Sequence, residues 1–309
     1  MTTTGFPAHF GALFNPRGVV VVGASAHPGK FGFVALHNVL AAGYTGPVFA
    51  TNLDGETVLG IATVASVDDL PNDTVDLAVI CTPARTNADI LRACARKGIR
   101  AAFITSAGYG EAGPEGFLAQ QELVALAQAL NIMIAGPNGQ GVVSTPAKLC
   151  AQIVAPYPPA GRIGIASQSG NFVSSFMNWS VGSGVGISRA VSAGNAAMVT
   201  VADYLDFYGD DDATAVGLAY VEGIADGRAF YQRMRAVAAR KPLVLVKGDP
   251  PKEANAPLPH IPAPWPPTTR SSTEHVARPV YRDAQRWKRR STWPPVSPPS
   301  PYREGPMWW

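Results

Sequence analysis

A turn of small polar residues in the middle of the chain has the composition of an anion-binding site. It follows the apolar run Ile163–Ala166, typical of a short buried strand, and precedes a helix expected over Phe172–Ser183. The first backbone N–H groups of a helix lack intrahelical partners, and the helix dipole favours negative charge there. We therefore expect unpaired N–H groups at Ser167, Ser169 and Gly170, although the two serines could instead serve only as helix caps. Such a turn predicts an anion site, usually for a phosphate.

The length and composition limit the classes of protein that fit. The 309 residues allow two domains, and a hydrophobic content of 47% is sufficient for buried cores. No apolar run reaches the roughly 18 residues of a membrane span, and no secretory signal is evident at the start. The three scattered cysteines, Cys81, Cys94 and Cys150, fit a reducing cytoplasm. They predict neither a disulfide framework nor a metal site.

Charge and composition change after Gly248. Residues 249–309 hold nine of the 25 basic and five of the 22 acidic residues, which leaves 16 basic against 17 acidic residues in 1–248. The body of the chain therefore carries no basic excess for nucleic acid. The last 61 residues also hold 15 of the 28 prolines and five of the six tryptophans, without hydrophobic periodicity. We expect this tail to be disordered or irregular.

Residues 1–150 alternate strand and helix patterns. The β-branched run Gly18–Gly23 is typical of a buried parallel strand, and a helix pattern follows from Phe33. Further strands are expected at Val48–Ala50, Leu77–Cys81, Ala101–Ile104 and Ile132–Ala135, and further helices at Asn87–Lys97, capped by Thr86, and Pro114–Leu130. This alternation predicts a doubly wound, Rossmann-like parallel sheet. Ligands of such sheets bind at the carboxyl ends of the strands.

A nicotinamide dinucleotide site is one interpretation of the first glycine-rich loop. The glycines at Gly23, Gly29 and Gly32 do not have the G-x-G-x-x-G spacing of such sites. The second strand is followed by Asn52, where an acidic residue would be expected to bind the ribose hydroxyls. Both observations disfavour an oxidoreductase, and the glycines could also serve only the turn from strand to helix.

Four motifs of this domain together resemble a known family. They are Val-Gly-Ala-Ser-x-x-Pro-Gly-Lys-x-Gly (Val22–Gly32), Val-Asp-Leu-Ala-Val-Ile-Cys-Thr-Pro-Ala (Val75–Ala84), Ser-Ala-Gly-Tyr-Gly-Glu (Ser106–Glu111) and Gly-Pro-Asn-x-x-Gly (Gly136–Gly141). In this order they resemble the NDP-forming acyl-CoA synthetases and the succinyl-CoA synthetase alpha subunit. The resemblance implies that the first domain binds coenzyme A. The residues implied in binding are Gly23, Ala24, Ser25, Lys30, Gly32, Asn52, Pro83 and Asn138.

Residues 155–248 form a second strand–helix repeat, which the resemblance identifies as an incomplete flavodoxin-like domain of the succinyl-CoA ligase type. Its expected elements after Phe172–Ser183 are strands at Gly186–Val191, Thr214–Val221 and Leu243–Val246, and helices at Val199–Tyr208 and Gly227–Arg240. In this family the domain serves a phosphohistidine. The resemblance assigns Glu222 as the carboxylate that orients the histidine. The residues that it implies in binding the phosphoryl group are Ser167, Gln168, Ser169, Gly170 and Asn171. Without the resemblance, Glu222 could be a solvated loop charge.

The histidine itself is missing from its expected place. The chain has His9, His27, His37, His260 and His275, and none lies in residues 38–248. The family motif should follow Gly248 by about a dozen residues, but His260 has proline-rich neighbours. Codons shifted by one base across Pro259–Pro266 permit Ser-His-Thr-Gly-Ala-Leu-Ala, a motif typical of the family. Our hypothesis is that residues from about 249 are translated out of frame.

These observations predict the coenzyme A-binding, alpha-like part of an acid–thiol ligase that works through a phosphohistidine. The expected ligands are coenzyme A, phosphate and an acyl-CoA or its carboxylic acid. Mg-ATP or Mg-ADP would bind only to an ATP-grasp domain or beta-type subunit, and this chain alone is expected to be inactive. Alternatives are a non-catalytic coenzyme A- or nucleotide-binding module and an NAD-dependent oxidoreductase. We expect a cytoplasmic protein that binds neither membrane nor nucleic acid.

Overall fold

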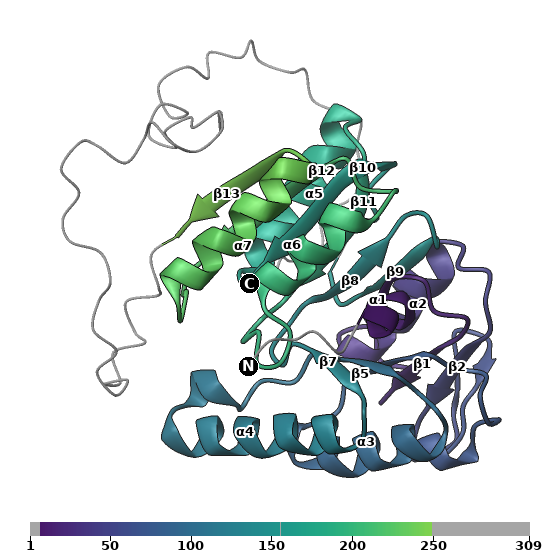
Figure 1. Ribbon diagram of the computed structural model, residues 1–309. Helices are drawn as coiled ribbons and strands as arrows, with labels where there is room; N and C mark the ends of the chain where they lie inside the picture. The colour runs from purple at the N-terminus through teal and green to yellow at the C-terminus, as the bar shows by residue number, and fades with distance from the viewer. Residues whose placement is uncertain (1–6, 155, 249–309) are drawn as a thin grey trace. The chain divides into compact units, whose positions relative to one another are not determined.

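A computed structural model of the chain describes residues 7–154 and 156–248. Within them the chain forms two sheets with helices on their faces (Figure 1). The tail expected to be disordered and the proposed frame change lie outside the described residues, as do His260 and His275. No helix in the described ranges is both long enough and apolar enough to cross a membrane.

The first sheet is entirely parallel, with the strand order β2-β1-β5-β6-β7. Its strands are β1 (Val19–Val22), β2 (Val48–Thr51), β5 (Leu77–Ile80), β6 (Ala101–Ile104) and β7 (Met133–Ala135). Its helices are α2 (Phe31–Ala41), α3 (Asn87–Arg96) and α4 (Pro114–Ala129). This is the predicted Rossmann-like arrangement. A small hairpin, β3 (Thr57–Val58) with β4 (Ile61–Ala62), and three short 3-10 turns, Val67–Asp69, Ala84–Thr86 and Gly110–Ala112, complete this region.

The second sheet is mixed, with the order β13-β12-β10-β11-β8-β9. Strands β10 (Ala160–Ser167), β11 (Ile187–Ser192), β12 (Val216–Val221) and β13 (Leu243–Lys247) are parallel. Its helices are α5 (Gly170–Ser183), α6 (Val201–Asp210) and α7 (Gly227–Arg240). Ile165 packs with Val173 of α5, whereas the next residue, Ala166, belongs to the cluster that contains Tyr204 of α6. Alternate residues of β10 thus face helices on opposite sides of the sheet.

Residues 141–152, which follow the last strand of the first sheet, form a hairpin that extends the second sheet. Strand β8 (Gly141–Ser144) pairs with β9 (Leu149–Gln152) and, antiparallel, with β11. The predicted first domain, residues 1–150, contains most of this hairpin. Short apolar strands carry no signal for which sheet edge they join, so this pairing was not predictable from periodicity.

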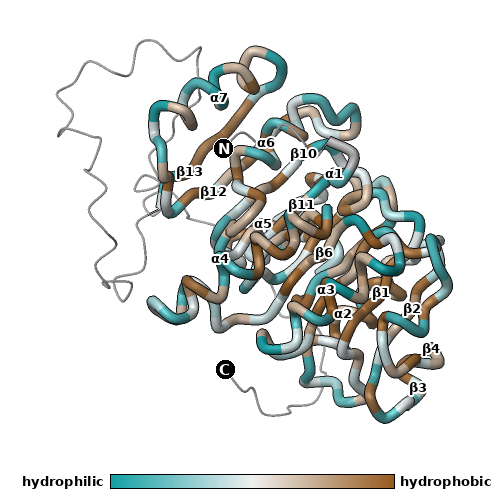
Figure 2. Tube along the Cα trace, turned by 60° about the horizontal axis from the view of Figure 1, so that its bottom comes forward, coloured by the Kyte–Doolittle hydropathy of each residue, from teal (hydrophilic) through white to brown (hydrophobic). Residues whose placement is uncertain are grey.

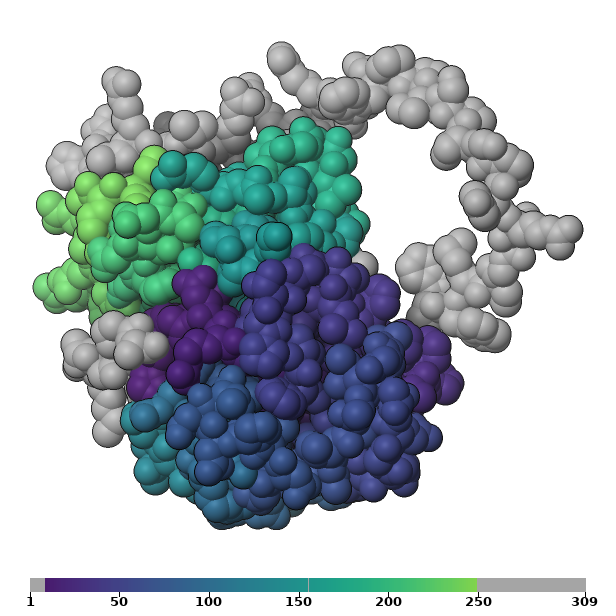
Figure 3. Space-filling model, turned by 90° about the vertical axis from the view of Figure 1, so that its right-hand side faces the viewer, coloured from purple at the N-terminus to yellow at the C-terminus, as the bar shows by residue number. Residues whose placement is uncertain are grey.

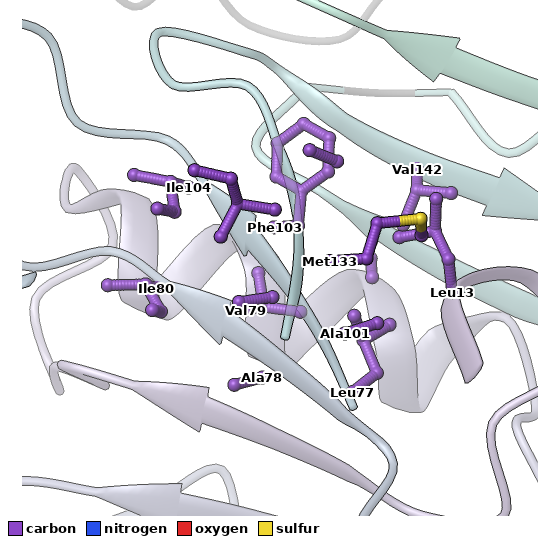
Figure 4. Close-up of a cluster of buried hydrophobic side chains, with 14 of the residues drawn as sticks. Leu13, Leu77, Ala78, Val79, Ile80, Ala101, Phe103, Ile104, Met133 and Val142 are labelled. Atoms are coloured by element: carbon purple, nitrogen blue, oxygen red, sulfur yellow. The ribbon is translucent and has the colours of Figure 1, made fainter. Parts of the chain in front are cut away.

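The N-terminal helix α1 (Pro7–Phe14) was also absent from the predicted elements, and it connects the two sheets. The rings of Phe10 and Phe14 stack on Phe207 of α6, with centroids 4.9 and 5.3 Å apart. Leu13 is buried with side chains of β5, β6 and β7 and with Val142 of β8 (Figure 4). The purple α1 surface accordingly lies beside both the blue first-sheet region and the green second-sheet region (Figure 3).

The strands are more apolar than the helices around them, as their brown colour shows in Figure 2. Residues Val19–Val22 and Leu77–Ile80 are almost fully buried, as expected of strands covered on both faces. Arg189 places a buried charge in the second sheet. Arg189 of β11 pairs with Asp211 at 3.2 Å and donates to the Phe14 carbonyl, also at 3.2 Å. Its guanidinium therefore ties α1 to the second sheet.

Three helix starts differ from the predictions, either in their capping side chain or in their first residue. Thr86 does not cap α3, because its hydroxyl donates to Thr82 and Pro83 instead and a 3-10 turn runs directly into the helix. Helix α5 begins at Gly170, two residues before the predicted start, because Ser169 is its N-cap. Helix α6 begins at Val201 because Thr200 forms a capping box with Asp203.

Candidate functional site

A cavity of about 530 Å³ lies where the loops at the carboxyl ends of both sheets meet. The second sheet contributes the turn before α5, the loop after β11 and the residue after β12. The first sheet contributes loops after β6 and β7 and the start of α2. The lining residues are Phe31, Thr105, Ala107, Glu111, Asn138, Gly139, Gln140, Ile153, Gln168, Ser169, Gly170, Asn171, Gly194, Asn195 and Glu222. Four of the five predicted phosphate-binding residues and Glu222 therefore share one cavity.

The fifth residue of the predicted phosphate turn, Ser167, points inward instead. It is fully buried, and its hydroxyl accepts from the Ser169 N–H at 3.0 Å and donates to the Ser169 carbonyl at 2.8 Å. Ser169 in turn caps α5 by accepting from the Phe172 N–H. The expectation of an unpaired N–H at Ser169 is therefore wrong, because the Ser167 hydroxyl satisfies it.

The unpaired donors of the turn belong to the first two residues of α5. Within residues 7–154 and 156–248, the backbone N–H groups of Gly170 and Asn171 have no hydrogen-bond acceptor. Both residues line the cavity, and the first turn of α5 contains no acidic side chain. A helix start with free N–H groups and no carboxylate attracts an anion. An anion site at this turn stays a prediction, and its expected donors are now the N–H groups of Gly170 and Asn171.

Gln168 holds the end of β12 beside this helix start. Its Oε1 accepts from the N–H groups of Glu222, at 2.6 Å, and Gly223, at 3.1 Å. The Glu222 carbonyl accepts from the Lys247 ammonium at 2.9 Å. The backbone of Glu222 is thus fixed on both sides, while its carboxylate has no partner among the described residues and lines the cavity. The side-chain oxygen of Gln168 is thus occupied by hydrogen bonds from the backbone of residues 222 and 223.

Asn195, in the loop after β11, joins the two sheets at the rim of the cavity. Its amide nitrogen donates to the carboxylate of Glu111 and to Gln120 Oε1, and its oxygen accepts from Asn138 at 3.3 Å. Burial raises the pKa of Glu111, but hydrogen bonds from Asn195 and from the backbone N–H of Gly108 outweigh burial, and the pKa is lowered overall. Glu111 is therefore an ionised anchor that positions Asn195 at the cavity.

The residues implied in coenzyme A binding lie at the carboxyl edge of the first sheet. Gly23, Ala24 and Ser25 follow β1, Asn52 follows β2, Pro83 follows β5, and Asn138 follows β7. Asn138 lines the cavity with Phe31, which stands between Lys30 and Gly32. Asn52 is partly engaged, because its amide donates to the Ala24 carbonyl at 3.0 Å and its oxygen accepts from Asp54 at 2.7 Å.

The glycine-rich loop of residues 23–32 leaves fewer backbone N–H groups free for a ligand than its composition indicates. The N–H groups of Gly23 and Ala24 already donate to Thr51. Those of Phe31 and Gly32, at the start of α2, have no acceptor among the described residues, and the first turn of α2 has no acidic side chain. A Cβ at Gly32 would overlap the Gly23 carbonyl, so only glycine allows this close approach of helix and loop.

Sequence reasoning did not single out Asn195, Gln140 or Phe31 as site residues. Asn195 and Gln140 follow a strand end, which is the one positional signal that could have identified them. No described histidine lines the cavity: His27 accepts from the Gly29 N–H at 3.0 Å, and His9 is buried against Asn131. Within the described ranges, no group of three or more histidine, cysteine or acidic side chains could hold a metal ion.

Comparisons with known proteins agree with the two-part organisation. A coenzyme A-binding domain model matches residues 17–145, and a succinyl-CoA ligase-like flavodoxin domain model matches residues 160–263. The chain is 39% identical over 240 residues to the alpha subunit of ADP-forming acetate–CoA ligase I of Pyrococcus furiosus, covering 76% of this chain and 52% of that protein. It is 35% identical to a trans-feruloyl-CoA synthase of an unknown prokaryotic organism, covering 76% and 34%.

Solved structures show the same likeness. A dinucleotide-forming acetyl-coenzyme A synthetase 1 of Candidatus Korarchaeum cryptofilum, in complex with phosphate and ADP, superposes with a TM-score of 0.73 at 34% identity. The match covers 77% of this chain and 51% of that one. The chain spans about half the length of this protein and of the Pyrococcus subunit, and about a third of the feruloyl enzyme.

Proposed function

Because the chain belongs to the NDP-forming acyl-CoA synthetases and corresponds to their alpha-like part, we propose that its cavity brings coenzyme A and phosphate together for acyl transfer. The observation that carries the proposal is the meeting of two helix starts with free N–H groups, α2 and α5, and the unpaired carboxylate of Glu222 around one cavity. Neither helix start has an acidic residue in its first turn.

Coenzyme A is proposed to bind along the carboxyl edge of the first sheet. The free N–H groups of Phe31 and Gly32 would bind its phosphates, and the exposed Lys30 ammonium, one residue earlier, would add a positive charge. The overlap that any Cβ at Gly32 would produce indicates how closely backbone approaches backbone here. From this edge, the thiol end of the ligand would reach Asn138, which lines the cavity.

The start of α5 is proposed to hold phosphate against the thioester. A phosphate oxygen attacks the acyl carbonyl carbon of acyl-CoA, the carbon–sulfur bond breaks, and the thiolate takes up a proton, which gives acyl phosphate and coenzyme A. The N–H groups of Gly170 and Asn171 would stabilise the phosphate oxygens through fixed donors that need no reorganisation. Gln168 would serve by holding Glu222 in place.

Glu222 is proposed to orient a histidine that accepts the phosphoryl group from acyl phosphate and releases the carboxylate. A carboxylate hydrogen-bonded to one imidazole nitrogen leaves the other as a nucleophile. Since no described histidine lines the cavity, we propose that the histidine comes from the coding sequence after codon 248 in the shifted frame. ADP or GDP would then take the phosphoryl group from it on an ATP-grasp domain or beta-type subunit.

The DNA after codon 248 tests the origin of the histidine. A one-base shift that restores Ser-His-Thr-Gly-Ala-Leu-Ala in the proper place would support the proposal. A coding sequence with no such shift would contradict it and leave the chain as a non-catalytic coenzyme A-binding module. That second candidate is favoured by one observation, the absence of histidine from the cavity lining in the described residues.

A thermal-shift titration of the chain with coenzyme A, phosphate and NAD tests ligand binding. We expect coenzyme A to raise Tm, phosphate to raise it further, and NAD to have little effect. Ligand at 100 times Kd would add about 2.7 kcal/mol to the free energy of unfolding. Stabilisation by NAD without stabilisation by coenzyme A would contradict the proposal.

A further inference from the structure

A second cavity, of about 310 Å³, adjoins the first on the other side of Gln168 and Asn195. It is bounded by the start of α6, the loop of residues 223–226 and the first half of α7. Gln168 and Asn195 line both cavities, so the two cavities meet at these two side chains.

The other charged and hydroxyl side chains of the second cavity already have partners in the protein. Thr200 of the lining is paired with Asp203 in the capping box of α6. Asp226 caps α7 by accepting from the Ala229 N–H at 2.9 Å. Arg233 donates to Asp203 Oδ1 at 2.7 Å. These groups therefore offer little to a charged ligand, because binding one would first require breaking existing bonds.

The remaining side chains of the lining are hydrocarbon. Val201, Val221, Ile224, Ala229 and Phe230 contribute their side chains. Val201 and Val221 are buried, whereas Ala229 is exposed. An apolar group that enters this cavity is removed from water without unpairing a polar group, which is favourable.

The two cavities, which meet at Gln168 and Asn195, thus differ in chemistry. The first holds the free N–H groups of Gly170 and Asn171 and the Glu222 carboxylate, and the second holds apolar side chains. A ligand with a polar head and a hydrocarbon tail fits the pair. We propose that the second cavity binds the acyl chain of the thioester, with the carbonyl carbon kept in the first. This rests on the proposed function, and it assigns aliphatic or aromatic acyl groups larger than acetyl as substrates.

Calorimetric titration with a chain-length series tests the assignment on the full chain. The ligands are coenzyme A and its acetyl, butyryl and hexanoyl thioesters. Each methylene buried in the cavity should tighten binding about fourfold, so hexanoyl-CoA should bind roughly 15-fold more tightly than butyryl-CoA. Ala229→Leu fills part of the cavity and should abolish this gain while leaving the affinity for coenzyme A unchanged. Ala236→Leu, at an exposed position of α7 outside the cavity lining, should behave as the parent chain.

These measurements distinguish a failure of the acyl-binding assignment from a failure of the proposed function. Equal chain-length dependence in the parent chain and in Ala229→Leu would overturn the acyl assignment alone, as would thioesters that bind no more tightly than coenzyme A. Failure of the parent chain to bind coenzyme A would overturn the proposed function and the acyl assignment together. Unchanged affinity of Ala229→Leu for coenzyme A shows at the same time that the variant is folded.

Discussion

Replacing Arg189 with methionine is expected to destabilise the protein by about 3 kcal/mol, because it leaves a buried carboxylate without its cation. The side chains of Arg189 and Asp211 are only 3% and 10% exposed. The guanidinium also donates to the Phe14 carbonyl and, at 2.9 Å, to Asn15 Oδ1. Methionine has a similar length and no donors, so each of these acceptors loses a partner.

The size of this loss of stability depends on the hydrogen bonds that Asp211 keeps in the variant. Removing one partner of a buried pair costs about 3–5 kcal/mol. Asp211 keeps a hydrogen bond from the Thr214 hydroxyl at 2.8 Å, which places the expected loss near the lower end. For a chain of this size about 1 kcal/mol corresponds to 2–4 °C in Tm, so differential scanning calorimetry should show a decrease of roughly 6–12 °C.

The loss of stability in Arg189→Met should depend on pH. Burial raises the pKa of Asp211, but hydrogen bonds from Arg189 and Thr214 outweigh burial and lower it overall. A carboxyl with a lowered folded-state pKa stabilises the fold above its ordinary pKa, about 3.9, and this stability disappears as pH falls through the lowered value. The difference in Tm between the parent and the variant should therefore be largest at neutral pH and shrink below about pH 4.

Arg92→Met is the matched control, because Arg92 pairs with Asp89 at 2.7 Å on the surface, with the side chains 50% and 87% exposed. Exposed pairs contribute less than about 1 kcal/mol, so Tm should fall by at most a few degrees. A similar decrease in both variants, or a pH-independent loss in Arg189→Met, would refute the reasoning that burial makes the Arg189–Asp211 pair important.

Three further predictions concern the site. Glu222→Gln, in the frame-restored chain with an ATP-grasp partner, should lower phosphohistidine formation about 100-fold, measured by radiolabelled phosphate, while coenzyme A affinity stays the same. Asn195→Ala should raise the pKa of Glu111, because a hydrogen bond that lowers it is removed, and a carboxyl NMR titration that shows no upward shift would contradict this. Gln168→Leu should lower phosphohistidine formation in the same radiolabelled-phosphate assay by displacing Glu222, and unchanged formation would argue against that positioning role.

Much of the fold could be predicted because buried parallel strands are continuous apolar runs. Val19–Val22 and Leu77–Ile80 have no polar residue to face solvent, so their identity as central strands follows from composition alone. The positions of loops at strand ends follow from the alternation of strands and helices, whereas the family resemblance singled out Asn138 and Glu222. The Rossmann-like first sheet and the family resemblance are confirmed.

The remaining features depend on contacts between residues distant in sequence. The pairing of β8 with β11 and the stacking of Phe10 on Phe207 have no local signal. The inward hydroxyl of Ser167 and the acceptor role of Gln168 depend on which backbone N–H groups lie beside them in three dimensions. The polar turn therefore predicts an anion site, but its sequence could not say which of its residues line the cavity.

Calorimetric titration of coenzyme A into the parent chain, Gly32→Ala and Gly182→Ala tests whether the start of α2 binds coenzyme A. A Cβ at Gly32 overlaps the Gly23 carbonyl, whereas a Cβ at Gly182, also within a helix, meets nothing within 4 Å. We expect one coenzyme A to bind per chain in the parent and in Gly182→Ala, and binding to be weakened at least tenfold in Gly32→Ala. Absence of coenzyme A binding in the parent, or unchanged affinity in Gly32→Ala, would contradict this expectation.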